Sequence, residues 1–477
     1  MDQTEIHIDF SPTICRLIGP VPEDAVNLLY EKLAFRQTGY FFAPRYQSGL
    51  WDGYTRLFNT NKNQFKCGLL SRVVHILHEG GYVPVVRNKP ASEKFEWILS
   101  QDACERRPYQ IELSEAICRV RFGIAKAPPR TGKTNVMVAV SAFEDKFPVT
   151  VFCRSIDLCE QTVDRFRSLL PWKNIGYVSN GVVNIGDVTV ITIQSAYFAY
   201  KKKYEEKGLQ EEADIANKED VRDVIESAKI VFYDEVHHGG AKTSRFILGK
   251  SARACMKIGL SATPFAGAPE DLLIEETLGP VIHEISYSKL IREGYLLKPT
   301  IYMYTLPALG VDGNYRQVYS NAVVENDFLY DLIKRIVDKL LSLNKSVVIQ
   351  TDLIKHTKKL GDYLGCETLT GQQRDASKRK DLIARIRNKE VKCVVSTVLE
   401  EGIDLPQLDY TINASGGLSS ISTLQKMRSI TAVDGKTTCG IIDFYHQCKY
   451  LEKHSKARLK AYKSEPEFEI VMRDVSN

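Results

Sequence analysis

The stretch that decides the fold of this chain is Phe122-Gly-Ile-Ala-Lys-Ala-Pro-Pro-Arg-Thr-Gly-Lys-Thr-Asn-Val-Met-Val-Ala-Val140. Its centre, residues 127–134, fits the phosphate-loop pattern with alanine in place of the first glycine. The apolar segments on both sides suit a strand, a loop and a helix. In such a loop, backbone N–H groups at the start of the helix bind phosphates. Lys133 would reach the β- and γ-phosphates and Thr134 would bind Mg²⁺, so the pattern predicts a nucleotide site.

A second motif, Ile230-Val-Phe-Tyr-Asp-Glu-Val-His237, is an apolar strand that ends in two adjacent acids. Asp234 would bind Mg²⁺ opposite Thr134, and Glu235 would orient and deprotonate the attacking water. Acid pairs are common on protein surfaces, so this pair alone is a weak signal. Its position after a phosphate loop in the same α/β unit makes it a strong signal of a nucleotide-hydrolysing site. A metal site at His237-His238 is not expected, because adjacent residues rarely face one ion.

Short runs rich in Val and Ile alternate with amphipathic segments from about residue 105 onward. Runs this short are typical of strands buried on both faces of a parallel sheet, and the helical segments between them indicate βαβ units. Two sets of these units predict two doubly wound domains in series, at 101–297 and 298–450. We also expect a charged, partly helical insertion at 201–229 and a basic carboxy-terminal tail at 451–477. The expected strands include 149–153, 188–193, 230–233, 347–349 and 391–395.

Residues 1–100 are expected to form a small separate α+β domain. The stretch 39–58 is dense in aromatic and turn residues, which predicts short strands and hairpins and not helix. Between residues 36 and 89, eight basic residues face two acidic ones, which gives this window a net charge of +6. Aromatic residues interleaved with Arg and Lys suit base stacking and phosphate contact. The alternative is that these aromatic residues are the core of a small β domain.

The 477-residue chain is 44% hydrophobic and 26% charged, which is ordinary for a globular protein and excludes general disorder. Its net charge of +5 is too small to identify a partner. No apolar run suits a membrane helix and the acidic start does not fit a secretory signal, so we expect a cytoplasmic protein. Eleven scattered cysteines without CxxC spacing predict reduced thiols, and neither a zinc site nor a disulfide framework.

A third segment, Ile258-Gly-Leu-Ser-Ala-Thr-Pro264, is another strand that runs into a small polar turn, and Val395-Ser-Thr-Val-Leu-Glu-Glu-Gly-Ile-Asp404 follows it. The order of these four motifs resembles superfamily 2 helicases and translocases over residues 105–445. The resemblance implies two RecA-like domains that close on ATP and Mg²⁺, with Lys133, Asp234 and Glu235 as catalytic residues. Thr134 and Asp234 would be the metal ligands. The resemblance further implies ATP contacts from Arg107, Gln110, Pro129, Arg130, Thr131, Gly132, Lys133, Thr134, Gly402 and Asp404, and nucleic-acid contacts from Arg154, Gln194, Ser195, Thr351 and Thr397.

The amino-terminal stretch Gly39-Tyr-Phe-Phe-Ala-Pro-Arg-Tyr-Gln-Ser-Gly-Leu-Trp-Asp-Gly53 is similar to that of UvsW-type phage helicases, which remodel branched DNA. This resemblance implies ATP-dependent unwinding or branch migration of forks and Holliday junctions in replication, recombination or repair. The active form would be a monomer or a DNA-dependent assembly. If a phage encodes the protein, it would act in the cytoplasm of the bacterial host. The DNA contacts implied in this domain are Arg45, Tyr46, Trp51 and Arg56.

The chain departs from the family at Gln425-Lys-Met-Arg-Ser-Ile-Thr-Ala432, where two arginines are expected to face the nucleotide. An ungapped match to the family pattern places Ser429 and Ala432 where the arginines are expected. A one-residue shortening would place Arg428 at the first, catalytic position and Thr431 at the second, so an arginine is missing either way. The alternative is that Arg130, inside the phosphate loop, serves there. Two other functions stay open: an RNA helicase of the DExH type, and a DNA-binding protein with a weakened motor. RNA is less favoured as a partner than DNA.

Overall fold

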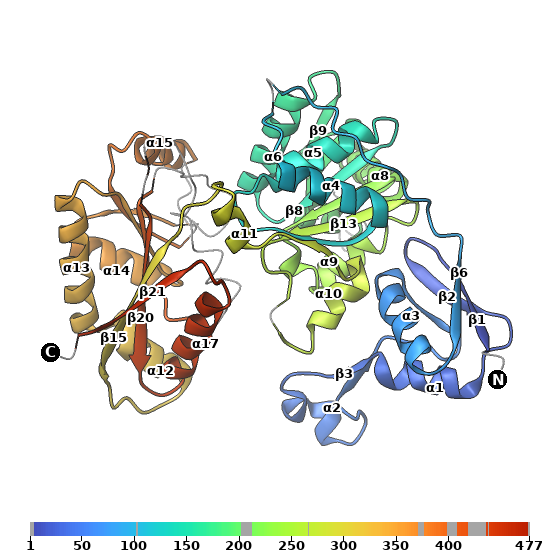
Figure 1. Ribbon diagram of the computed structural model, residues 1–477, viewed down its shortest axis with the longest axis horizontal. Coiled ribbons are helices and arrows are strands. Elements are labelled where there is room, and N and C mark those ends of the chain that lie inside the picture. The colour runs from blue at the N-terminus through green and yellow to red at the C-terminus, as the bar shows by residue number, and fades with distance from the viewer. Residues whose placement is uncertain are drawn as a thin grey trace. The chain divides into compact units, whose positions relative to one another are not determined.

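The computed structural model describes residues 4–101, 104–201, 212–265, 267–370, 376–397, 408–417, 436 and 438–475. By their contacts, the residues form two units, which change over between Glu284 and Ile285, and residues 128–130 are grouped with the second unit. The first unit holds the amino-terminal domain and the first α/β domain, and the second unit holds the second α/β domain (Figure 1). The expected fold class, two parallel-sheet α/β domains after a small α+β domain, is confirmed.

The amino-terminal domain is built on a mixed sheet of four strands in the order β5-β2-β1-β6. Helices α1 and α3 contact each other, and their buried residues Leu29 and Leu77 share one hydrophobic cluster with Ile6 and Ile8 of β1. The elements are β1 (Glu5–Asp9), β2 (Ile14–Ile18), α1 (Glu23–Lys32), β5 (Gln64–Lys66), η2 (Cys67–Leu69), α3 (Leu70–Glu79) and β6 (Val83–Arg87).

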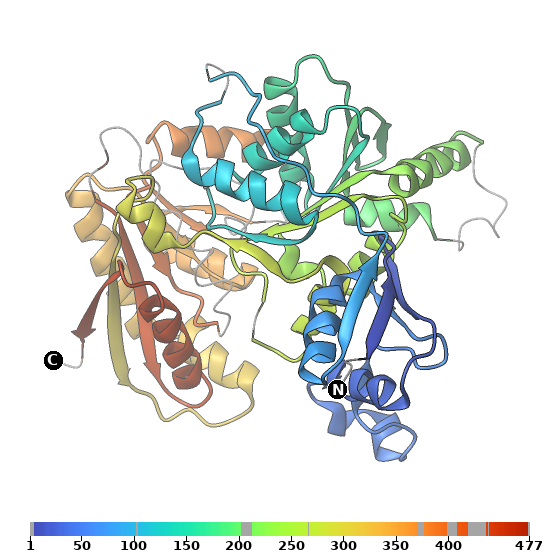
Figure 2. The same ribbon diagram turned by 45° about the vertical axis from the view of Figure 1, so that its right-hand side comes forward.

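An arm extends from this domain between α1 and β5 (Figure 2). Its base is an antiparallel ribbon of β3 (Ala34–Arg36) and β4 (Tyr54–Arg56), and between the strands lie η1 (Tyr40–Phe42) and α2 (Pro44–Gln47). The prediction that residues 39–58 contain no helix is therefore wrong. Pro44 at the first helical position supplies the fixed φ that starts α2, and Gly49, with φ of 72°, follows its end.

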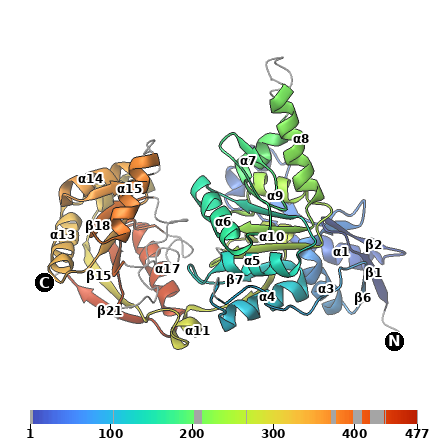
Figure 3. The ribbon, with the colours of Figure 1, turned by 90° about the horizontal axis from the view of Figure 1, so that it is seen from above.

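The first α/β domain has an eight-stranded sheet in the order β10-β9-β11-β8-β12-β13-β7-β14, parallel except for β10. Helices α7 to α10 pack on one face in a single hydrophobic cluster, and α4, α5 and α6 cover the other face (Figure 3). Its strands are β7 (Phe122–Lys126), β8 (Val149–Cys153), β9 (Ile175–Ser179), β10 (Val182–Asn184), β11 (Val188–Thr192), β12 (Ile230–Asp234), β13 (Met256–Ser261) and β14 (Val281–Glu284). Its helices are α4 (Pro108–Val120), α5 (Lys133–Phe143), α6 (Ile156–Leu169), α7 (Ile193–Ala199), α8 (Glu212–Ser227), η4 (Val236–His238), α9 (Lys242–Leu248) and α10 (Asp271–Leu278). The charged insertion contains α8, which stands out beside α7.

The second α/β domain has a parallel seven-stranded sheet in the order β17-β18-β16-β19-β20-β15-β21. Its strands are β15 (Thr300–Ala308), β16 (Val347–Gln350), β17 (Glu367–Leu369), β18 (Cys393–Ser396), β19 (Tyr410–Asn413), β20 (Gly440–Gln447) and β21 (Glu469–Asp474). Its helices are α11 (Tyr287–Arg292), α12 (Tyr315–Tyr319), η5 (Ser320–Val324), α13 (Asp327–Ser342), α14 (Ile354–Leu364), α15 (Ala376–Arg387) and α17 (Leu451–Lys463). Residues 451–474 were expected in a basic tail, but they form α17 and β21, and β21 pairs in parallel with β15.

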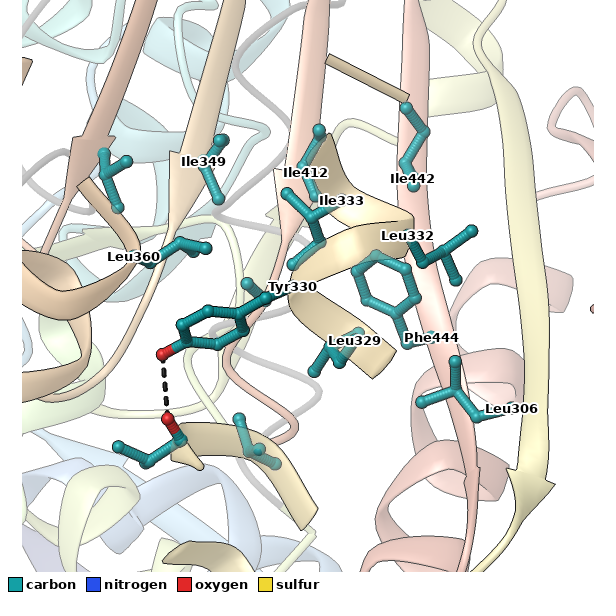
Figure 4. Packing of buried hydrophobic residues seen from close by; sticks show 14 of the residues in the cluster. Leu306, Leu329, Tyr330, Leu332, Ile333, Ile349, Leu360, Ile412, Ile442 and Phe444 are labelled. Atoms are coloured by element: carbon teal, nitrogen blue, oxygen red, sulfur yellow. Dashed lines mark hydrogen bonds between the residues drawn. The ribbon is translucent and has the colours of Figure 1, made fainter. Parts of the chain in front are cut away.

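The core of the second α/β domain forms where the apolar face of α13 meets the sheet (Figure 4). Asn326 caps α13 by accepting a hydrogen bond from the Leu329 N–H, and this places Tyr330 and Ile333 against the strands. The Tyr330 hydroxyl donates to the Val324 carbonyl at 2.8 Å, so its polar atom is satisfied inside the core. Burying each large apolar side chain contributes about 1.5–3 kcal/mol, so this cluster stabilises the packing of α13 on the sheet.

Candidate nucleotide and nucleic-acid site

The phosphate loop lies between β7 and α5, as predicted. Gly132, with φ of 76°, precedes the first residue of α5, and a Cβ added there would lie 2.3 Å from the Gln110 side-chain nitrogen. Gln110 Nε2 instead donates to the Thr131 carbonyl at 2.9 Å. Only glycine fits this backbone with Gln110 so close, and Gln110 in turn supports the loop.

Gln110 and Arg107 lie at the start of α4, next to this loop. Gln110 is 1% exposed, and its side-chain oxygen Oε1 has no hydrogen-bond partner among the described residues. Arg107 donates to Glu105 at 2.8 Å and to the Tyr109 hydroxyl at 3.1 Å, so its guanidinium is already held in place. A buried acceptor without a partner, such as Gln110 Oε1, suits a ligand with a hydrogen-bond donor, for example the amino group of adenine.

The two acids of the second motif lie at the end of β12, beside the phosphate loop. Lys133 Nζ is 3.9 Å from Glu235 Oε1, and both side chains are largely buried. Glu235 has φ of 56°, a left-handed conformation that is rare for this residue type, and its N–H donates to Asp234 Oδ1 at 3.0 Å. Burial first, and then the charge of Glu235, raise the pKa of Asp234 to about 6, although Lys133 opposes this shift. A cation placed here would favour the ionised form of Asp234.

Two further side chains surround Glu235. His237 Nδ1 lies 3.4 Å from Glu235 Oε2, and the Ser261 hydroxyl donates to the same oxygen at 3.5 Å. Ser261 also accepts a hydrogen bond from the Thr263 N–H at 3.2 Å, so the third motif touches the second. The sequence predicted this motif but not its contact with Glu235. That contact follows from the parallel register of β12 and β13, in which Asp234 pairs with Leu260.

All these groups lie at one edge of the sheet, where the carboxyl ends of parallel strands meet. This edge is where open α/β sheets bind their ligands. Arg154 follows β8, and Gln194 and Ser195 follow the adjacent strand β11, so the three predicted nucleic-acid contacts share that edge. Arg154 and Gln194 are exposed, while Thr192 caps α7 and donates to the Ser195 hydroxyl at 2.8 Å.

In the second α/β domain, Thr351 follows β16 and Thr397 follows the adjacent strand β18. Thr351 is only 1% exposed, and its hydroxyl shares a 2.6 Å hydrogen bond with Thr357. Its side chain is thus buried against α14, which does not fit the predicted contact with a nucleic-acid strand. Thr397 is half-buried and its N–H donates to Leu369 at 3.2 Å. Gly402, Asp404 and Arg428 lie outside the described residues.

Of the four predicted DNA contacts of the arm, Arg45 is exposed, and Tyr46, Trp51 and Arg56 are half-buried. Arg45 is exposed on α2, and Arg56 pairs with Asp52. Tyr46 packs edge-on against Tyr40, with ring centroids 4.7 Å apart, and Trp51 Nε1 donates to the Tyr54 carbonyl at 2.8 Å. The most exposed apolar side chains of the arm are others, which residue type alone did not single out: Phe41, Phe42 and Leu50.

Comparisons with known families agree with this geometry. Residues 103–266 match the family described as type III restriction enzyme, res subunit, and residues 327–428 match the helicase conserved C-terminal domain. The candidate helicase 22 of the Sulfolobus islandicus filamentous virus is 24% identical over 76% of this chain and 68% of its own length. The DNA 3′–5′ translocase XPB2 of Sulfurisphaera tokodaii is 22% identical over 70% of this chain and 80% of its own length.

Two solved structures are also similar to this chain. S. cerevisiae Dbp5 bound to RNA and ADP–BeF3 is similar with a TM-score of 0.52 and 17% identity, over 80% of this chain and 96% of that one. T4 UvsW is similar with a TM-score of 0.48 and 16% identity, over 99% of both chains. Among the described residues, no helix is long and apolar enough to cross a membrane.

Proposed function

Because this chain belongs to the superfamily 2 helicases, we propose that it uses ATP hydrolysis to move along DNA and to unwind or branch-migrate forks and Holliday junctions. The observation that carries the proposal is the convergence of Lys133, Asp234 and Glu235 at one sheet edge, with Ser261 against Glu235. Arg154, Gln194 and Ser195 lie at the same edge, next to the nucleotide groups. ATP turnover and strand contact would therefore act on one rigid sheet.

Each residue of the nucleotide site has a specific task in this proposal. Lys133 holds the β- and γ-phosphates, and the leftover acceptor of Gln110 fits the adenine amino group. Thr134 and Asp234 would hold Mg²⁺, which neutralises the charge of the transferred phosphoryl group. Glu235 takes the proton of the attacking water, and Ser261 and His237 hold its carboxylate in position.

Two features favour DNA over RNA as the partner. XPB2 is named as a DNA translocase, and the chain matches most of its length. The arm also carries exposed apolar and basic side chains, the composition that suits a branch point of DNA. The likeness to Dbp5 is a likeness of fold and does not separate the two nucleic acids.

The deciding experiment compares ATP turnover and strand separation on forks, Holliday junctions, linear duplexes and structured RNA. We expect branched DNA to stimulate turnover most. Lys133→Ala should abolish turnover because the phosphate cation is lost, and Glu235→Gln should bind ATP without hydrolysing it because the base is lost. Near-parental turnover by either variant, or stimulation by RNA alone, would refute the proposal.

A further inference from the structure

The tip of the arm carries a pair of unusually exposed aromatic side chains. Phe41 is 51% exposed and Phe42 is 74% exposed, and their ring centroids lie 4.2 Å apart. Leu50, on the return segment of the arm, is 75% exposed. Single exposed apolar residues are common, but neighbouring ones of this size indicate a surface that binds a partner.

The other aromatic residues of the arm hold it rigid. Tyr40 lies between the Arg36 guanidinium, 4.0 Å from its ring centroid, and the edge-on ring of Tyr46. Gly53, with φ of 84°, lets the chain pass so near Tyr40 that an added Cβ would lie 2.8 Å from its ring. The phenyl pair therefore adjoins a set of packed side chains within the arm.

The charge around the pair suits nucleic acid. Residues 34–57 contain Arg36, Arg45 and Arg56 and one acid, Asp52, which pairs with Arg56. Arginines beside exposed aromatic faces bind phosphates while bases stack on the rings. An apolar groove of a partner protein would match Phe41 and Phe42, but it would offer no negative charge to Arg36 and Arg45.

The arm is fixed to the domain that binds the nucleotide. The Thr38 N–H donates to Glu270 Oε1 at 2.6 Å, and its hydroxyl donates to Glu270 Oε2 at 3.0 Å. Glu270 lies directly before α10, in the segment that follows the Ser261–Thr263 turn. A displacement of the first α/β domain along DNA would thus carry the arm with it.

We propose that Phe41 and Phe42 form a wedge that stacks on the first base pair of a DNA branch and separates its strands. The inference rests on the proposed function, because translocation would supply the force that drives the branch against the wedge. Arg36 and Arg45 bind phosphates of the two DNA duplexes that meet at the branch. The phenyl rings replace the stacking that the opened base pair loses. Every base has a face that stacks, so the wedge acts without regard to sequence.

The test measures how many base pairs of a fork are opened for each ATP hydrolysed, with the full-length protein. In the double variant Phe41→Ala/Phe42→Ala this ratio is expected to fall at least about tenfold, because ATP turnover continues while the branch slips past the arm. Phe42→Trp, which keeps an aromatic face, should preserve the ratio. Trp172→Ala is the control, since Trp172 is 60% exposed but lies outside the arm.

Two results overturn the wedge. One is a parental ratio in the double alanine variant, and the other is a proportional fall of unwinding and ATP turnover, which would make the arm a general DNA contact. Failure of the proposed function looks different, since the parental protein itself would then show no DNA-stimulated turnover.

Discussion

At the scale of single residues, the acids at the end of β12 are positioned for chemistry at a cost in stability. Asp234 is 5% exposed, and burial together with the charge of Glu235 raises its pKa to about 6. Glu235 has a left-handed backbone, which costs on the order of 1–3 kcal/mol for a non-glycine residue. Such costs are typical of sites where function and stability compete.

The variant Asp234→Asn is therefore expected to stabilise the nucleotide-free protein while it impairs ATP hydrolysis. The pKa of Asp234 is higher in the folded state than its ordinary value of 3.8, so ionised Asp234 destabilises the fold above pH 6. The gain, on the order of 1–3 kcal/mol near pH 7.5, should shrink as the pH falls from 6 to 4 and the parental carboxyl takes up its proton. Thermal melts across this pH range measure it.

Asp164→Asn is the matched control, because Asp164 is an exposed acid on α6 of the same domain. This variant should melt close to the parental temperature, because its side chain is exposed to solvent. If Asp234→Asn melts at the parental temperature at every pH, then the ionised Asp234 carboxylate does not destabilise the folded protein.

At the scale of elements, a buried ion pair joins α17 to the second sheet. Arg458 Nε lies 2.9 Å from Asp443 Oδ2, and both side chains are almost completely buried. Arg458 also donates to the carbonyls of Gly417 and Phe444 at 2.8 Å, and the Tyr462 hydroxyl donates to Asp443 at 2.9 Å. The network is fully satisfied, so the removal of either charge leaves the other buried without a partner.

Arg458→Met should destabilise the second α/β domain by about 3–5 kcal/mol, because the variant leaves the Asp443 carboxylate without its cation. Denaturant unfolding measures the loss. Lys456→Met is the control from the same helix, since the Lys456 side chain is 63% exposed and its pair with Glu452 is a surface pair. Equal unfolding free energies for the two variants would contradict the role of the network.

The buried network of Arg458 and Asp443 could not be predicted from the sequence, whereas the strands of the first sheet could. The apolar runs 149–153 and 230–233 form buried strands, as their short length and β-branched residues predict. The phosphate loop follows β7, and the acid pair lies at the end of β12. Arg458 lies in a basic stretch that looks like a solvated tail in the sequence. Its buried partner Asp443 lies in β20, fifteen residues earlier, so the sequence around Arg458 does not show the pair. Thr351 is predicted to contact nucleic acid, but its hydroxyl bonds to Thr357 in the core. A threonine that bonds to a core neighbour and one that contacts a ligand look alike in the sequence.

At the scale of the whole molecule, the amino-terminal domain shares a core with the first α/β domain. Phe122 of β7 and Leu272 of α10 belong to the hydrophobic cluster of the amino-terminal sheet, and Phe122 packs edge-on against Phe10. Arg72 makes a bidentate pair with Glu275 of α10, at 2.8 and 2.5 Å. Removal of residues 1–100 would uncover this core, so point variants of the arm test its role in DNA binding better than truncation does.

The two domains approach each other closely at Gly68. A Cβ added to Gly68 would lie 2.1 Å from the Glu275 carbonyl oxygen and 2.6 Å from that of Glu276, and these backbone atoms belong to α10. Gly68→Ala should therefore force the two domains apart and cost about 1–3 kcal/mol, as overpacking of a core does. We expect a melting temperature lower by several degrees, and weaker coupling of fork opening to ATP turnover, because the arm loses its fixed position. Gly310→Ala, where an added Cβ meets nothing within 4 Å, should melt like the parent, and an equally stable Gly68→Ala would show that the two domains do not rely on this contact.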